Sequence, residues 1–283
     1  MSPHITITTG IAFVLLGCVF LLLVVVPLLP TYDPYTQDLA SSLLPPFERL
    51  DDGRLSVFGT DKLGRDVLSR MALAGWVSLF IGLSAVAVSM VIGTVLGLAA
   101  GYFRDWVETA IMALADLQLS IPRVLLLIAV SALLGSTVVK LALLLGLTSW
   151  VVYGRVARAL ALSLREREFV LSAVTLGATP AWNIRKHLLP NVLPQVVIVG
   201  SFDLGQIIIL EASLSYLGLG VQPPLPSWGL MISEGQSYLE LNPWLSVIPG
   251  MALFMLVAGV QFLTQSITAE GAEERELAVK PLS

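Results

Sequence analysis

The chain has 283 residues, of which 56% are hydrophobic and only 13% charged, and this balance excludes an ordinary soluble domain. Its mean hydropathy of +0.85 instead indicates an integral membrane protein. The apolar runs do not alternate with polar residues, so they favour spanning helices over a transmembrane barrel. The net charge of −4, with no cluster of Lys and Arg, gives no indication of nucleic-acid binding.

Stretches nearly free of charge predict an all-α polytopic protein with six transmembrane helices, because about 20 apolar residues cross the hydrocarbon core. The helices are expected at about 10–30, between Arg70 and Arg104, and at about 107–134, 140–157, 192–214 and 244–268. We divide the chain into an N-terminus with the first helix at 1–30, an extracytoplasmic loop at 31–75, a five-helix core at 76–268 and a cytoplasmic tail at 269–283.

The distribution of Lys and Arg predicts the orientation in the membrane. The region around 158–191 is rich in these residues, whereas the loop 215–243 has none. We therefore expect 158–191 and both termini in the cytoplasm. Five basic residues in the 31–75 loop argue for the opposite orientation: Arg49, Arg54, Lys62, Arg65 and Arg70.

Small residues recur at every fourth position of the second expected helix, namely Ala85, Ser89, Gly93, Gly97 and Gly101. Such a face lets a neighbouring helix backbone come close, which is a main packing device in lipid. The neighbour is either another helix of this chain or a helix of a partner subunit.

A polar segment, residues 163–190, interrupts the apolar sequence and is called the hairpin below. Residues 163–176 predict a helix, and Gly177 stands where a left-handed C-terminal cap is expected. Thr179 and Pro180 then predict the N-cap and first position of a second short helix, which should end before Pro190.

One face of the first short helix carries Phe169, Ala173 and Leu176 at helical spacing. A short helix with small residues at its tip can enter a groove on another protein. Alternatively, the hairpin lies on the lipid surface, although such helices usually carry more basic residues beside a broader apolar face.

The spacing of the hairpin residues resembles the "EAA" loop of ABC importer permeases. That pattern reads Glu-Ala-Ala, three residues, Gly, nine residues and Ile-x-Leu-Pro, and here Leu171-Ser172-Ala173, Gly177 and Leu189-Pro190 keep its spacing. Leu171 and His187 replace the Glu and the Ile.

Two other segments, 58–70 and 211–229, resemble the second permease subunit of dipeptide, oligopeptide, glutathione and nickel importers. The resemblance covers roughly residues 10–265, and the C-terminus lacks the family's usual Gly-Asp-x-Leu-Arg-Asp ending.

The resemblance implies a type I importer bundle with a cytoplasmic coupling-helix hairpin, in a multi-pass protein of the bacterial inner membrane. It implies a homologous second permease subunit, two cytoplasmic ATPase subunits or domains, an extracytoplasmic substrate-binding protein and surrounding lipid as partners. ATP and Mg²⁺ would be bound by the ATPases, and this chain would hold no cofactor. The implied ATPase-docking residues are Phe169, Ser172, Ala173, Leu176, Gly177, Ala178, Leu189 and Pro190.

Four ionisable residues lie in or near the expected helices, where charge is costly and usually faces water or the bundle interior. Asp116 and Arg123 are expected to pair with each other. Asp203 either lines a pathway or pairs within the bundle, and Glu211 is expected to face water at the base of the 216–243 loop, where it would also be a candidate for lining the pathway. We expect that loop, with Trp228 at an interface, to shape the outer opening.

The sequence predicts neither catalysis nor metal binding. No Gly-x-x-x-x-Gly-Lys-Ser/Thr phosphate loop occurs, and His4 and His187 are the only histidines. The function implied is therefore a non-catalytic permease forming half of a translocation pathway for di- or oligopeptides or a related small cargo. The alternatives are a secondary transporter or channel, which often shows inverted repeats that are not visible here, and a membrane scaffold.

Overall fold

The computed structural model describes residues 3–50 and 53–279, and most of them are helical. The long helices are α1 (Pro3–Phe20), α2 (Val67–Phe103), α5 (Val138–Arg165), α8 (Leu189–Tyr216) and α10 (Trp244–Val279). The shorter ones are α3 (Asp105–Leu119), α4 (Arg123–Leu134), α6 (Glu168–Thr175), α7 (Pro180–Asn183) and α9 (Trp228–Gln236). Strands β1 (Glu48–Arg49) and β2 (Leu55–Ser56) pair antiparallel in the loop before α2.

In the described part of the chain, five helical segments are long and apolar enough to cross a membrane. They are Ile7–Leu28, Val67–Phe103, Val138–Arg165, Pro180–Tyr216 and Trp244–Ala269. Helices α3 and α4 meet at an angle of 83°. They form a sixth span only if this bent pair is counted as one segment. Pro122 lies at this break, where it lacks a donor N–H and disfavours helix in the residue before it. The expected helix at 107–134 is therefore sharply bent.

The chain folds into two compact units. Unit 1 comprises Met1–Gly82, Ser131–Leu141 and Gly205–Ser283, and unit 2 comprises Leu83–Val130 and Ala142–Leu204.

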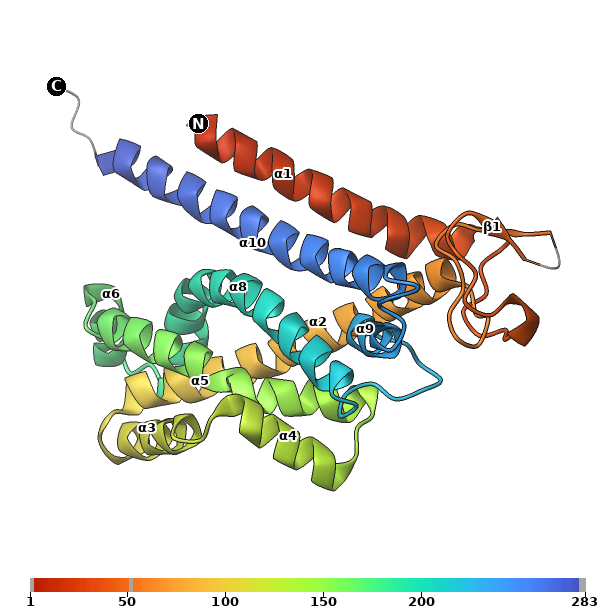
Figure 1. Ribbon diagram of the computed structural model, residues 1–283. Coiled ribbons are helices and arrows are strands. Elements are labelled where there is room, and N and C mark those ends of the chain that lie inside the picture. The colour runs from red at the N-terminus through yellow and green to blue at the C-terminus, as the bar shows by residue number, and fades with distance from the viewer. Residues whose placement is uncertain (1–2, 51–52, 280–283) are drawn as a thin grey trace. The chain divides into compact units, whose positions relative to one another are not determined.

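In unit 1, α1 lies along α10 (Figure 1). Gly259 permits this approach, since a Cβ there would lie 2.8 Å from Cγ of Leu16. Helix α10 continues to Val279, so residues 269–279 extend the last helix where a separate tail was expected.

Helix α9 packs on α10 and begins at Trp228, whose side chain is fully buried in unit 1. Its Nε1 donates a hydrogen bond of 3.0 Å to the Met71 carbonyl, and Gly75 leaves room for the ring. The expectation that Trp228 lies at an interface is therefore wrong. The buried Nε1–H has a partner, so the whole indole can enter the core.

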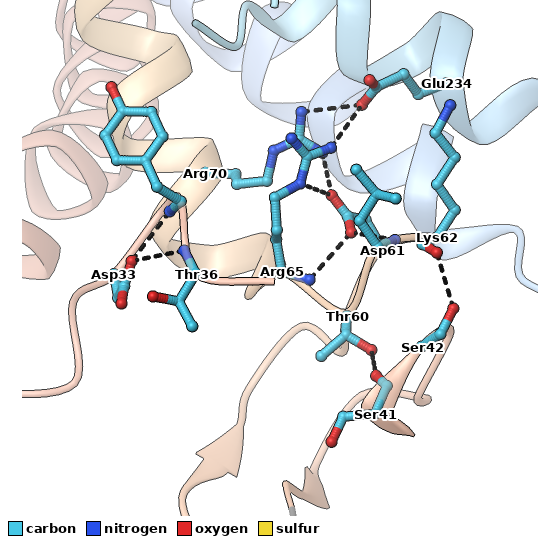
Figure 2. A network of polar contacts seen from close by, with 12 residues as sticks. Asp33, Thr36, Ser41, Ser42, Thr60, Asp61, Lys62, Arg65, Arg70 and Glu234 are labelled. Carbon is cyan, nitrogen blue, oxygen red and sulfur yellow. Dashed lines mark hydrogen bonds and ion pairs between the residues drawn. The ribbon is translucent and has the colours of Figure 1, made fainter. Parts of the chain in front are cut away.

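A buried network of charges joins the loop before α2 to α9, as Figure 2 shows. Asp61 accepts from Arg65 Nε at 2.7 Å and from Arg70 Nη1, while Arg70 Nη2 donates to Glu234 at 2.9 Å. The Asp61 carboxylate also accepts the backbone N–H groups of Leu63 and Arg65. The network therefore neutralises two of the basic residues that opposed the predicted orientation.

In unit 2, α2 lies directly against α5 along its row of glycines. A Cβ on Gly93 would lie 2.4 Å from the Trp150 carbonyl, and one on Gly97 would lie 2.3 Å from the Gly154 carbonyl. A Cβ on Gly101 would lie 2.6 Å from Cβ of Ala161. The glycines of this row therefore serve packing within the chain, the first of the two interpretations.

Candidate functional site

The hairpin begins with a break between α5 and α6. Residues 163–176 were expected to form one helix, but α5 ends at Arg165 and α6 starts at Glu168. Arg167 between them is extended, with φ −75° and ψ 143°, and its carbonyl accepts the first hydrogen bonds of α6. The break lets Val170 turn inward and become buried in the core of unit 2.

Gly177 ends α6 in the left-handed conformation, with φ +89°, as the sequence predicted. The N–H of Ala178 binds the carbonyl of Ala173 at 3.0 Å, and the N–H of Gly177 binds that of Val174 at 2.9 Å. These two bonds form a Schellman cap. Thr179 then caps α7 through its side chain, which accepts the Trp182 N–H, and Pro180 follows at the first helical position. Both cap predictions are confirmed.

The second short helix does not end before Pro190, contrary to the prediction. Helix α7 continues through a π-helical turn, Ile184–Leu188, into α8, so that Pro180–Tyr216 forms one long segment. The N–H of Leu189 binds the carbonyl of Ile184, five residues back. Pro190 has no N–H for an α-helical bond and would clash with the carbonyl four residues before it, and the wider turn accommodates this.

Polar and apolar contacts hold the hairpin on the rest of unit 2. Asn183 is buried and donates to the Tyr102 hydroxyl at 3.3 Å, while Arg165 donates to the Tyr102 carbonyl at 2.5 Å and lies over its ring. Val170 and Leu188 are buried in a cluster with residues of α2, α5 and α8. The inner face of the hairpin is therefore fixed.

The outer face of the hairpin is apolar and exposed. A surface depression of about 460 Å³ is lined by Ala173, Leu176, Gly177, Ala178, Thr179 and Trp182. Leu176 is 87% exposed and belongs to a contiguous apolar surface, the kind of patch that marks interaction sites.

The eight predicted docking residues do not all lie together. Four of them line the depression: Ala173, Leu176, Gly177 and Ala178. Phe169 and Ser172 are exposed on α6, beside it in sequence. Leu189 and Pro190 lie in the first turn of α8, where Leu189 packs against the core of unit 2.

Trp182 is part of this surface, although the sequence analysis did not single it out. Its indole is 47% exposed and lines the depression. His187 lies edge-on to the rings of Trp182 and Phe169, with centroid distances of 5.0 and 5.4 Å. The sequence did offer a signal for Trp182, since it is an aromatic residue in a polar segment, three positions after the predicted N-cap Thr179.

The expected pairing of Asp116 with Arg123 is wrong. Asp116 pairs with Arg155 of α5 at 2.7 Å, and Arg123 donates to the Ser149 hydroxyl. The two residues lie on either side of the 83° bend, so the helical spacing that aligned them does not apply.

Glu211 does not face water as expected. It is fully buried in unit 1, where it accepts hydrogen bonds from Ser78 at 2.9 Å and Ser215 at 2.7 Å. These hydroxyls take the place of solvent. Asp203, by contrast, is half-buried and accepts a hydrogen bond of 2.8 Å from the Tyr153 hydroxyl.

The chain has the fold of a type I ABC importer permease. A solved chain of the MetNI methionine ABC transporter, in an inward-facing conformation, covers 71% of this chain and 95% of its own length. The TM-score is 0.56 at 20% sequence identity, so this likeness concerns the fold.

The chain belongs to the family of binding-protein-dependent transport system inner membrane components, which matches residues 93–268. Similar proteins include the glutathione transport system permease protein GsiD of Pectobacterium atrosepticum, 36% identical over 77% of this chain and 73% of the relative. The probable D,D-dipeptide transport system permease protein DdpC of Escherichia coli is 34% identical over 94% of this chain and 86% of the relative.

The chain is accordingly a permease subunit of an ABC importer in the inner membrane, and ATP hydrolysis belongs to a separate subunit. Membership implies that it works with another permease and an ATPase. A secondary transporter or channel is not favoured.

Proposed function

We propose that this permease carries short peptides or peptide-like molecules such as glutathione. The support is that the names of similar relatives include glutathione, dipeptide and D,D-dipeptide transport. An extracytoplasmic binding protein delivers the cargo, a homologous permease forms the other half of the pathway, and two ATPase subunits or domains bind ATP and Mg²⁺.

The hairpin docks the ATPase. The observation that carries this proposal is an exposed apolar depression on a segment whose inner face is anchored by buried contacts. A surface held in this way transmits force, whereas a hairpin resting on lipid needs no such anchoring. Phe169, Ala173, Leu176 and Trp182 provide the apolar contacts, and Gly177 fixes the angle between α6 and α7.

In this arrangement the hairpin and both termini lie in the cytoplasm, and the loops before α2 and around α9 lie outside. Lipid covers the remaining apolar helix faces. The Lys and Arg residues around 158–191 and their absence from the loop 215–243 support this orientation.

Gly177→Leu tests the docking role. A side chain at a φ of +89° costs about 1–2 kcal/mol, so the cap should open and the angle between the two short helices should change. A Cβ at this position meets no atom of the chain within 4 Å, so the change causes no steric clash within the hairpin itself. In proteoliposomes with the partner subunits, we expect lost uptake and lost stimulation of ATP hydrolysis by loaded binding protein.

Gly177→Asn is the matched control, because Asn tolerates the left-handed region better than Leu. It should retain most of both activities. Uptake and stimulated hydrolysis at the wild-type level in Gly177→Leu would refute the docking role.

A further inference from the structure

Four polar side chains from three helices of unit 2 form two hydrogen-bonded pairs. Arg123 of α4 donates to the hydroxyl of Ser149, and Tyr153 donates to Asp203 of α8 at 2.8 Å. Ser149 and Tyr153 are both buried and lie one turn apart on α5, which corresponds to about 6 Å along the helix. A positive and a negative group are thus attached to adjacent turns of one helix.

Arg123 and Asp203 do not form an ion pair with each other in the described part of unit 2. In the described part of unit 2 the ion pairs are Arg104–Glu166, Arg155–Asp116 and Arg158–Glu108. Arg123 and Asp203 each bind a neutral hydroxyl instead, and both remain half-buried. Ionisable residues in a membrane segment are costly, and they usually face the bundle interior or water and mark a substrate or ion pathway.

Each charged group also keeps unused hydrogen-bonding capacity. The Nε of Arg123 is buried and has no partner among the described residues. The Oδ1 atom of Asp203 makes no hydrogen bond in the same part of the chain, since only Oδ2 accepts from Tyr153. Nε and an adjacent Nη of arginine form a fork that matches a carboxylate, and a carboxylate oxygen accepts readily from an ammonium group.

We propose that Arg123 and Asp203 form a transit site for zwitterionic peptide-like cargo. Arg123 binds the terminal carboxylate and Asp203 binds the α-ammonium group, while Ser149 and Tyr153 hold the two side chains in place. The two hydroxyl partners are attached to α5 about 6 Å apart along the helix axis, which is comparable to the length of one or two residues, because consecutive Cα atoms are about 3.8 Å apart. This inference rests on the proposed peptide-like cargo.

The test measures ligand binding to the whole transporter in nanodiscs. The binding protein is left out, so that only the transporter itself discriminates between the ligands. Saturation-transfer NMR titrations, which detect weak ligands, would compare alanyl-alanine with its N-acetyl and its amide derivatives. The wild type should bind the free dipeptide about tenfold more tightly than either derivative, the usual effect of a hydrogen bond to a charged group.

Two variants test the recognition of the two ends of the cargo separately. Asp203→Asn should lose the preference for a free ammonium group and keep the preference for a free carboxylate, and Arg123→Gln should do the reverse. Asp116→Asn is the matched control, because Asp116 pairs with Arg155 on the exposed part of the same unit. It should bind all three probes as the wild type does.

Equal binding of the three probes by the wild type would overturn the proposal, whether or not the variants fold. So would a loss of affinity in Asp203→Asn or Arg123→Gln that is the same for every probe, since a packing role predicts that result. ATP-driven uptake by the wild type is measured separately, so the transit site can fail while the proposed function stands.

Discussion

At the scale of residues, the buried polar groups of unit 1 are satisfied by neighbours distant in sequence. Glu211 binds Ser78, more than a hundred residues away, and Arg70 binds Glu234. Leaving a buried charge without its partner is strongly destabilising. These contacts therefore fix how the first part of α2 packs against α8 and α9 in unit 1.

Asp61→Asn tests this network. The change removes the charge that lies between Arg65 and Arg70, and we expect a loss of about 3–5 kcal/mol in the stability of unit 1, as for other broken buried pairs. The thermal unfolding midpoint of the purified complex should fall, and the 31–66 loop should become sensitive to protease.

Glu240→Gln is the control for this change, because Glu240 is exposed. It should unfold like the wild type. An unchanged midpoint together with an intact loop in Asp61→Asn would show that the network does not hold the loop.

At the scale of elements, the close contact between α2 and α5 depends on residues without a side chain. The backbone of Gly97 faces the carbonyl of Gly154. A backbone carbonyl in a helix cannot move aside for an added atom as the end of a flexible side chain could. Close backbone approach of this kind maximises van der Waals packing where lipid offers no hydrophobic driving force.

Gly97→Ala should push the two helices apart, since the new Cβ would lie 2.3 Å from a backbone oxygen. Overpacking of this kind costs about 1–3 kcal/mol. Gly17→Ala in α1 is the control, because a Cβ there meets no atom within 4 Å. The thermal unfolding midpoint should fall in Gly97→Ala and not in Gly17→Ala. Equal midpoints of the two variants would contradict the packing role of Gly97.

At the scale of the whole molecule, the proposed function requires the hairpin and the α8–α9 connection to lie on opposite sides of the membrane. Cys18 is replaced by Ser, and single cysteines are placed at Thr179 or Gln222, which are both exposed. In sealed cells an impermeant maleimide should label the cysteine at 222 and spare the one at 179. Labelling at 179 would invert the orientation.

The sequence predicted the features that depend on local chemistry. Uncharged runs located the helices, and the glycine and Thr-Pro signals located the caps at 177 and 179–180. It did not predict the bend between α3 and α4 or the π-helical turn before Pro190, although proline lies at both places. In each case the tertiary structure decides whether proline ends, bends or widens the helix.

The errors at Trp228, Glu211 and Asp116 have a common physical cause. Each concerned a polar group whose partner comes from a distant segment, so periodicity along one helix could not identify it. The docking surface was predicted in part, and Trp182 was missed because the depression forms only when α6 and α7 fold against each other.

Uptake of labelled alanyl-alanine into proteoliposomes that contain this chain with its partner permease and ATPase subunits tests the proposed transport. ATP is enclosed on the hairpin side, and loaded binding protein is supplied on the other. We predict uptake that requires both ATP and the binding protein. Uptake that continues without ATP would contradict the account, as would complete failure to transport this dipeptide, glutathione or any other short peptide.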